Sequence, residues 1–249
     1  MALRRSSPPD AAPGPHDPAH EHHHRKIQGG AARAAVFGIS DGLVSNVSII
    51  LGVAGADPAP GFVRLAGLAG LVGGAFSMAA GEYGSMKAQT ELLERELELE
   101  RIEIHRRPEG ERLELAGIYQ SRGVAPEVAD ELATHMMRDP ELALETHARE
   151  ELGIDPSELG SPVQAALFSF LAFVVGALVP LVPWFITRGT AATVSSMIFT
   201  AASAVGVGIA LANFTGRAWS RSAVRQLVIA VIPAAITFAV GNAVGVNVG

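Results

Sequence analysis

The sequence predicts an all-α membrane protein with five transmembrane helices and a water-soluble helical domain inserted between the second and third. The first observation is composition, because 49% of the 249 residues are hydrophobic and only 18% are charged. Soluble chains carry about 25% charged residues. The second is the abundance of glycine, with 27 residues, which lets helices approach closely in a membrane. The third is a very uneven distribution of charge along the chain.

Long runs with few or no charged residues identify the transmembrane helices. A helix needs about 20 apolar residues to cross the hydrocarbon core. The runs that meet or approach this length are 34–56, 65–81, 162–187, 189–216 and 226–249. Five such runs are too many to bury inside a soluble protein of this length. We therefore assign helices 1 and 2 to residues 26–84 and helices 3 to 5 to residues 161–249.

The segment between predicted helices 2 and 3 is acidic, and its pattern predicts further helices. Residues 83–160 hold 19 of the 25 acidic residues. Apolar residues recur among the charges, and prolines mark the expected helix starts. The expected helices are 84–106, as a continuation of the second transmembrane helix, 109–121, 126–138 and 140–153. We expect residues 85–160 to form a separate helical domain in the cytoplasm.

Basic residues predict the orientation, because lysine and arginine are enriched in cytoplasmic loops. Basic residues precede helix 1 and fill the loop between helices 4 and 5, whereas the other two short loops hold one arginine each. The N-terminus and the inserted domain are therefore expected in the cytoplasm and the C-terminus outside. Residues 1–25 are rich in proline and histidine and lack the apolar core of a signal peptide. We expect this tail to be disordered. Its histidines either chelate metal weakly or are simply solvated.

Composition also excludes several classes of function. The absence of cysteine rules out disulfides, iron–sulfur clusters and thiol catalysis. A net charge of −6 argues against nucleic-acid binding, and no nucleotide-binding loop is present. We expect a protein that is not an enzyme.

Carboxylates in the acidic segment fall at spacings that favour a metal site. The two pairs Glu100/Glu103 and Glu111/Glu114 are each three residues apart, so each pair shares a helix face. A fold at Pro108 would turn the pairs toward each other, and four converging carboxylates repel unless a cation lies among them. Fe²⁺ and Mn²⁺ suit such oxygen-rich sites.

The fourth expected helix offers two further ligands. His147 and Glu151 are four residues apart and would lie on one face. The alternative is that all these acids form an ordinary solvated surface interleaved with arginine.

Asp41 is the outlier within the predicted membrane helices. A carboxylate in a span costs about 2.5–3.5 kcal/mol and usually lines an ion or proton path. Ser45 and Ser48 extend its polar face, and Met78 offers a thioether on helix 2. Glu82 lies at the cytoplasmic end of that helix. The alternatives are a structural hydrogen bond for Asp41, core packing for Met78 and a snorkelling interfacial acid for Glu82.

Two motifs resemble a known family. Residues 41–46 (DGLVSN), followed by 51–56 (LGVAGA), resemble the first-helix signature of the vacuolar iron transporter family. Residues 77–83 (SMAAGEY) resemble its second helix, and 151–154 (ELGI) its cytosolic domain. The resemblance covers about residues 22–249, and the style of the sequence favours a bacterial-type member in the plasma membrane.

The resemblance implies a five-helix homodimer that exchanges cytosolic Fe²⁺ for protons across a lipid membrane. It places Asp41 and Met78 on a translocation path at the dimer interface. The metal ligands that it implies in the soluble domain are Glu100, Glu103, Glu111, Glu114 and Glu151. Where plant members have a methionine pair before the last glutamate, this chain has His147 and Ala148. Metal preference among Fe²⁺, Mn²⁺, Co²⁺ and Zn²⁺ therefore stays open.

The expected mechanism is proton-coupled antiport that exports Fe²⁺ for detoxification or storage. Protonation of Asp41 would weaken its hold on the metal, since one carboxylate binds either a proton or a cation. The competing hypotheses are a membrane-anchored, ferritin-like iron buffer and a metal sensor without transport.

Overall fold

The computed structural model describes residues 30–156 and 160–248, and within these ranges it contains helices and no strand. The predicted tail, residues 1–25, lies outside the described residues. The helices are α1 (Gly30–Gly55), α2 (Pro60–Arg106), α3 (Pro108–Ser121), α4 (Pro126–Met136), α5 (Pro140–Glu150), α6 (Pro162–Leu181), α7 (Pro183–Ile186), α8 (Gly189–Thr215) and α9 (Trp219–Val248). This confirms the all-α fold class.

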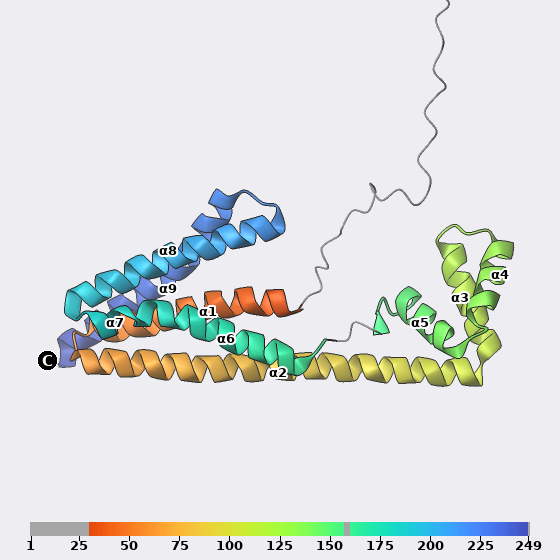
Figure 1. The fold of residues 1–249 in the computed structure, drawn as a ribbon, viewed down its shortest axis with the longest axis horizontal. Helices are drawn as coiled ribbons and strands as arrows, with labels where there is room; N and C mark the ends of the chain where they lie inside the picture. The colour runs from red at the N-terminus through yellow and green to blue at the C-terminus, as the bar shows by residue number, and fades with distance from the viewer. Residues whose placement is uncertain (1–29, 157–159, 249) are drawn as a thin grey trace, which may run out of the picture.

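Five of these helices are long and apolar enough to cross a membrane, namely α1, α2, α6, α8 and α9. They correspond to the five uncharged runs of the sequence. In Figure 1 they lie together as one bundle, while α3, α4 and α5 lie apart from it at the far end of α2. The prediction of five spanning helices with helical structure between the second and third is therefore confirmed.

Helix α2 joins the two regions without a break. It contains 47 residues, which is roughly 70 Å at 1.5 Å per residue. Its first half is apolar and its second half is charged, so one rigid element runs from the bundle to the soluble region (Figure 1). It ends where Pro108 begins α3, since a proline disfavours helical geometry at the residue before it.

The bundle is built around a very close contact between α1 and α6. A side chain at Gly42 would place its Cβ 2.2 Å from the carbonyl oxygen of Phe173, so only glycine fits there. Asn46, which is fully buried, donates from Nδ2 to the Ala177 carbonyl oxygen at 2.7 Å. Small residues let the backbones approach, and the buried amide then fixes the rotation of α1 against α6.

Helices α3, α4 and α5, called the soluble helices below, pack with the end of α2 in two small apolar clusters. Leu115 and Ala133 join α3 to α4, and Ile104 with Leu144 joins the end of α2 to α5. Asp139 caps α5 by accepting a hydrogen bond from the Glu141 backbone amide at 3.0 Å, as its position before a proline predicts.

Two helix ends differ from the predicted ones. Helix α4 ends at Met136 rather than at residue 138, and α5 ends at Glu150 rather than at residue 153. At the end of α5 the cause is Gly153, whose φ of 66° turns the chain back. This turn lets the backbone amide of Ile154 bond the Ala148 carbonyl oxygen at 2.8 Å.

Candidate metal centre

The turn between α2 and α3 brings three of the four paired glutamates into one place. Glu100 lies in the last turns of α2 and Glu111 in the first turns of α3, and both side chains are buried. Together with Glu103 they offer carboxylate oxygens that all lie within 4.8 Å of one another. Buried carboxylates at this separation repel one another, which is the arrangement that a divalent cation relieves.

Helix α5 adds an imidazole to this cluster. His147 is completely buried, and its Nδ1 lies 3.0 Å from Oε1 of Glu100, 3.7 Å from Oε2 of Glu151 and 4.0 Å from Oε2 of Glu111. Three carboxylates, from α2, α3 and the residue that follows α5, therefore surround one nitrogen. Imidazole combined with carboxylate is a donor set that first-row divalent metals accept.

The cluster is not satisfied by hydrogen bonds. Both ring nitrogens of His147 and Oε1 of Glu100 are buried and lack a partner with hydrogen-bond geometry, although Nδ1 and Oε1 are 3.0 Å apart. Buried polar atoms without partners are rare and need an explanation. Two buried ligand atoms that face one another at this distance can hold a shared cation.

Electrostatics in the cluster favour the protonated forms of Glu111, His147 and Glu151, because the pKa of each is raised. Burial, followed by the charges of Glu100 and Glu114, raises the pKa of both Glu111 and Glu151. Burial alone lowers the pKa of His147, but the neighbouring carboxylates outweigh it and raise the pKa above its usual value. Excess negative charge in a partly dry site produces all three shifts.

The predicted ligands do not share one environment. Glu100, Glu111 and His147 are buried, whereas Glu103, Glu114 and Glu151 are exposed. Glu114 belongs to neither compact ligand group among the described residues and influences the site only through its charge. Two neighbouring methionines serve packing, since Met136 lies against the Leu115 cluster and Met137 against the Ile104 cluster.

The membrane carboxylate has a very different setting. Asp41 is exposed on the surface of α1 and accepts a hydrogen bond from Ser45 Oγ at 2.9 Å. Ser48, one turn further on, donates instead to the Val44 carbonyl oxygen at 2.7 Å. Within one chain, Asp41 therefore faces outward from the bundle rather than into a cavity.

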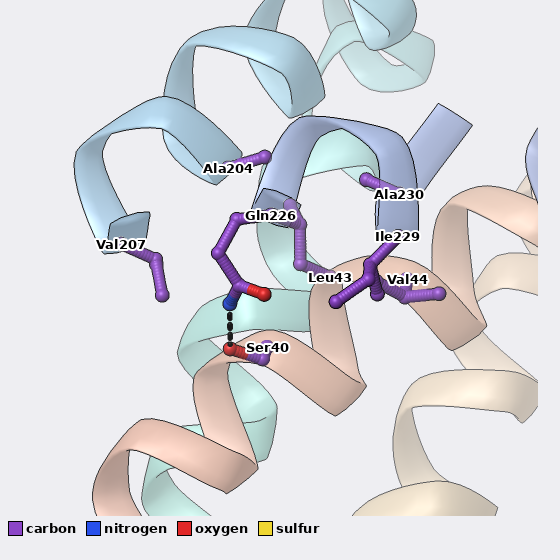
Figure 2. A pocket seen from close by; sticks show the side chains of 8 residues that line it. All are labelled: Ser40, Leu43, Val44, Ala204, Val207, Gln226, Ile229 and Ala230. Atoms are coloured by element: carbon purple, nitrogen blue, oxygen red, sulfur yellow. Dashed lines mark hydrogen bonds between the residues drawn. The ribbon is translucent and has the colours of Figure 1, made fainter. Parts of the chain in front are cut away.

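A contact between α1 and α9 explains why Asp41 points outward. Gln226 donates from Nε2 to Ser40 Oγ at 2.9 Å, beside a cavity of about 10 Å³ (Figure 2). Ser40 thus faces α9, and the next residue along a helix is rotated by about 100°. Sequence patterns do not predict a role for Gln226. Its one distinguishing feature in the sequence is that it is an amide at the start of an apolar run.

The other two predicted path residues lie on α2. Met78 is half-buried and packs against the apolar cluster of Ala75, Phe173 and Ala177 at the contact with α6. Glu82 is half-buried one turn further on. Met78 therefore contacts α6 inside the bundle, whereas Asp41 lies on the exposed side of α1.

An open apolar groove of about 650 Å³ continues the exposed side of α1. Its walls come from the end of α1, the start of α2 and the end of α9. Ser48 and Gly52 line it on α1, Phe62 on α2 and Thr237 on α9. A polar residue column on α1 thus leads from Asp41 toward a hollow on the outside of the bundle.

Five apolar spanning helices and a buried carboxylate–imidazole cluster define an integral membrane protein with a candidate cation site outside its membrane region. Comparison with known proteins agrees with this class. A model of the VIT family matches residues 32–242. The chain belongs to the VIT family.

Similar curated proteins are named as vacuolar iron transporters. Vacuolar iron transporter 1 of Oryza sativa subsp. japonica is 31% identical over 231 residues, which cover 91% of this chain and 92% of the relative. Vacuolar iron transporter 1 of Arabidopsis thaliana is 30% identical over 90% of this chain and 91% of its own length. The vacuolar iron transporter of Acanthamoeba castellanii is 38% identical over 74% of this chain and 69% of its own length. The resemblance to this family in the sequence motifs is confirmed.

Proposed function

We propose that this protein transports Fe²⁺ out of the cytoplasm in exchange for protons, in the way of a secondary antiporter. Iron as the substrate is supported by the names of its relatives. The exchange is supported by one observation in this chain. Asp41 is a lone carboxylate in an apolar helix, and among the described residues Ser45 is its hydrogen-bond partner and no cation pairs with it.

The proposed first step is capture of metal by the soluble cluster. Glu100, Glu111 and His147 are the buried ligands, and Glu103 and Glu151 lie at the exposed edge where an ion would enter. The imidazole is compatible with Fe²⁺ and with Mn²⁺, Co²⁺ and Zn²⁺, since nitrogen ligands suit the later first-row metals. Mn²⁺ is the second candidate substrate.

The proposed second step takes place at Asp41. A carboxylate in apolar surroundings binds either a proton or a divalent cation, because the two compete for the same charge. Protonation from the outer side releases the metal outward. Because Asp41 lies on the surface of one chain, we propose that a second copy completes the site beside Ser45, with Met78 of α2 as a further ligand on the path and Glu82 at the cytoplasmic entrance.

The proposed setting is a bacterial plasma membrane, with the soluble domain in the cytoplasm and the C-terminus outside. The charge distribution supports this orientation, because Arg217 lies between α8 and α9 and two further arginines lie in the first turns of α9. The domain division proposed for the chain is 26–84 and 161–249 in the membrane and 85–160 in the cytoplasm.

An iron buffer or a sensor would use the soluble cluster alone. Asp41 argues against both, because a protein that only stores or senses metal has no need of a carboxylate that costs energy in a membrane helix.

Uptake into liposomes by the purified protein separates these functions. We expect Fe²⁺ to accumulate above the outside concentration in liposomes that are acidic inside, without ATP, and to lose this accumulation when the pH gradient is dissipated. Empty liposomes are the control for leakage. Stoichiometric binding with no uptake under the gradient would contradict the proposal and favour the buffer.

A further inference from the structure

A basic cluster and an apolar stripe meet on the outer face of α9. The basic cluster consists of Arg217, Arg221 and Arg225, at the turn between α8 and α9 and the first turns of α9. All three side chains are exposed, and no carboxylate pairs with them in the described part of the chain. Gly216, with a φ of 65°, ends α8 just before this cluster, at the turn that joins α8 to α9 in Figure 1.

The stripe follows the arginines along the same helix face. Arg221 and Arg225 are four residues apart, and Val228, Ile232 and Ile236 continue the row at the next turns. These apolar side chains are 46%, 53% and 58% exposed. About half of each side chain is left uncovered by the described chain and is available to hydrocarbon in a membrane.

Two aromatic side chains mark the level of the membrane surface at the basic cluster. Phe214 and Trp219 are each 64% exposed, just before and just after Gly216. Exposed tryptophan at a helix end is typical of the boundary between hydrocarbon and headgroups. The arginines therefore lie at headgroup level, and the stripe lies at the level of the acyl chains.

We infer that this face binds an anionic phospholipid, with its phosphate headgroup on the basic cluster and an acyl chain along the stripe. Charge complementarity carries the inference, since three guanidinium groups without carboxylate partners in the described part of the chain attract anionic headgroups. Guanidinium also matches phosphate geometry, because it donates two parallel hydrogen bonds. The inference is independent of iron transport and of orientation.

Fluorescence quenching by brominated lipid tests this inference directly. The chain contains only two tryptophans, so W184F with W219F removes the background, and V228W places a reporter on the stripe one turn beyond Arg225. The full-length protein is reconstituted in phosphatidylcholine vesicles with an equal fraction of brominated phosphatidylglycerol or brominated phosphatidylcholine. We expect brominated phosphatidylglycerol to associate with the reporter at least about fivefold more strongly than brominated phosphatidylcholine.

Matched variants identify the cause of that preference. R217Q, R221Q and R225Q together are expected to abolish it, and lysine at the same three positions is expected to retain most of it. A reporter at V175W, on the exposed side of α6, is expected to show no preference. If the glutamine variant does not fold, high salt is expected to remove the preference by screening in the V228W reporter protein that keeps its three arginines.

Two results would overturn the inference. Equal quenching by the two brominated lipids at low salt would show that the arginines do not select anionic headgroups. Absence of quenching by either lipid would show that protein, such as a second copy, covers the stripe.

Discussion

The soluble cluster and the membrane carboxylate offer cations two very different settings. In the soluble region, α2, α3 and α5 bring buried ligand atoms together within a single chain. In the membrane, Asp41 is exposed on the outside of the bundle with one serine as its partner. The difference teaches that the first site is assembled by folding alone, whereas the second needs another surface before it can enclose an ion.

The two settings also differ in what folding has to overcome. Burying Glu100, Glu111 and His147 together concentrates charge, and the raised pKa of Glu111 and of His147 records this. A bound cation would relieve that cost, so metal binding and stability of the soluble helices are coupled. Asp41 lies exposed at the bundle surface, away from other carboxylates of the described chain that could share a cation with it.

The largest expected effect comes from Asp41→Asn, which changes the membrane carboxylate and leaves the soluble cluster as it is. The amide keeps the shape of the side chain but cannot exchange a proton for a cation. We expect Fe²⁺ uptake into liposomes to fall to the level of empty liposomes, with metal binding by the soluble cluster unchanged. Ser48→Ala, two turns further along α1 where the hydroxyl donates to the Val44 carbonyl oxygen, is the matched control and is expected to retain uptake.

Fe²⁺ uptake that persists in the Asp41→Asn variant would contradict the role of Asp41 in transport. Loss of metal binding in that variant, measured by equilibrium dialysis, would show that the two regions are not independent.

The next largest effect is expected from His147→Ala. Removing the buried imidazole takes away the nitrogen that lies 3.0 Å from Oε1 of Glu100 and leaves only carboxylates as ligands. We expect metal affinity of the full-length protein to fall by at least about tenfold, which corresponds to about 1.4 kcal/mol. His135→Ala, an exposed histidine on α4, is expected to change affinity by less than about twofold, and equal losses in both variants would show that His147 is not a ligand.

A smaller effect is expected from pH on the metal-free soluble helices. The pKa of His147, Glu111 and Glu151 is raised on folding, so each group binds protons more tightly in the folded state. For His147 the stabilisation is complete below its unfolded pKa of about 6.5 and is lost as pH rises through the folded pKa. The raised carboxyl pKa values act in the same direction.

Hydrogen exchange of α3 and α5 in the metal-free protein, corrected for the intrinsic effect of pH, measures this stabilisation. We expect more protection near pH 6 than near pH 8. Added metal should reverse the order, because protons compete with it. Protection that rises with pH in the metal-free protein would contradict the assignment of excess negative charge to this cluster.

The smallest effect is expected from Asn46→Ala in the bundle. The lost hydrogen bond to Ala177 is buried, and such bonds between membrane helices contribute about 0.6 kcal/mol on average. Asn242→Ala, an exposed amide on α9, is the control with no expected change. Thermal unfolding in detergent compares the two, and equal stability of both variants would show that Asn46 does not fix the rotation of α1.

The spanning helices were predictable because their signal is local. An uncharged run such as 189–216 encodes its own length and environment, and the structure places α8 there. The spacing of Glu100 and Glu103 is also local, since residues three apart share a helix face. The helix ends at 136 and 150 were less predictable, because a backbone turn such as that at Gly153 ends a helix within one or two residues.

The burial of each candidate ligand could not be predicted, because it depends on contacts between distant segments. His147 is buried only because α5 packs on the end of α2 through Leu144 and Ile104. The outward direction of Asp41 depends on two distant contacts of α1, from Asn46 to α6 and from Ser40 to Gln226 on α9. No spacing within α1 encodes either of them.

Simultaneous measurement of metal and proton flux tests the central claim, that one membrane carboxylate is shared by a metal ion and a proton. Purified protein would be reconstituted in liposomes with a pH-sensitive dye inside, and Fe²⁺ would be added outside. We predict that metal entry drives protons out at a fixed ratio, and that Asp41→Asn abolishes both fluxes together. Metal entry with no proton movement in the opposite direction would contradict the account.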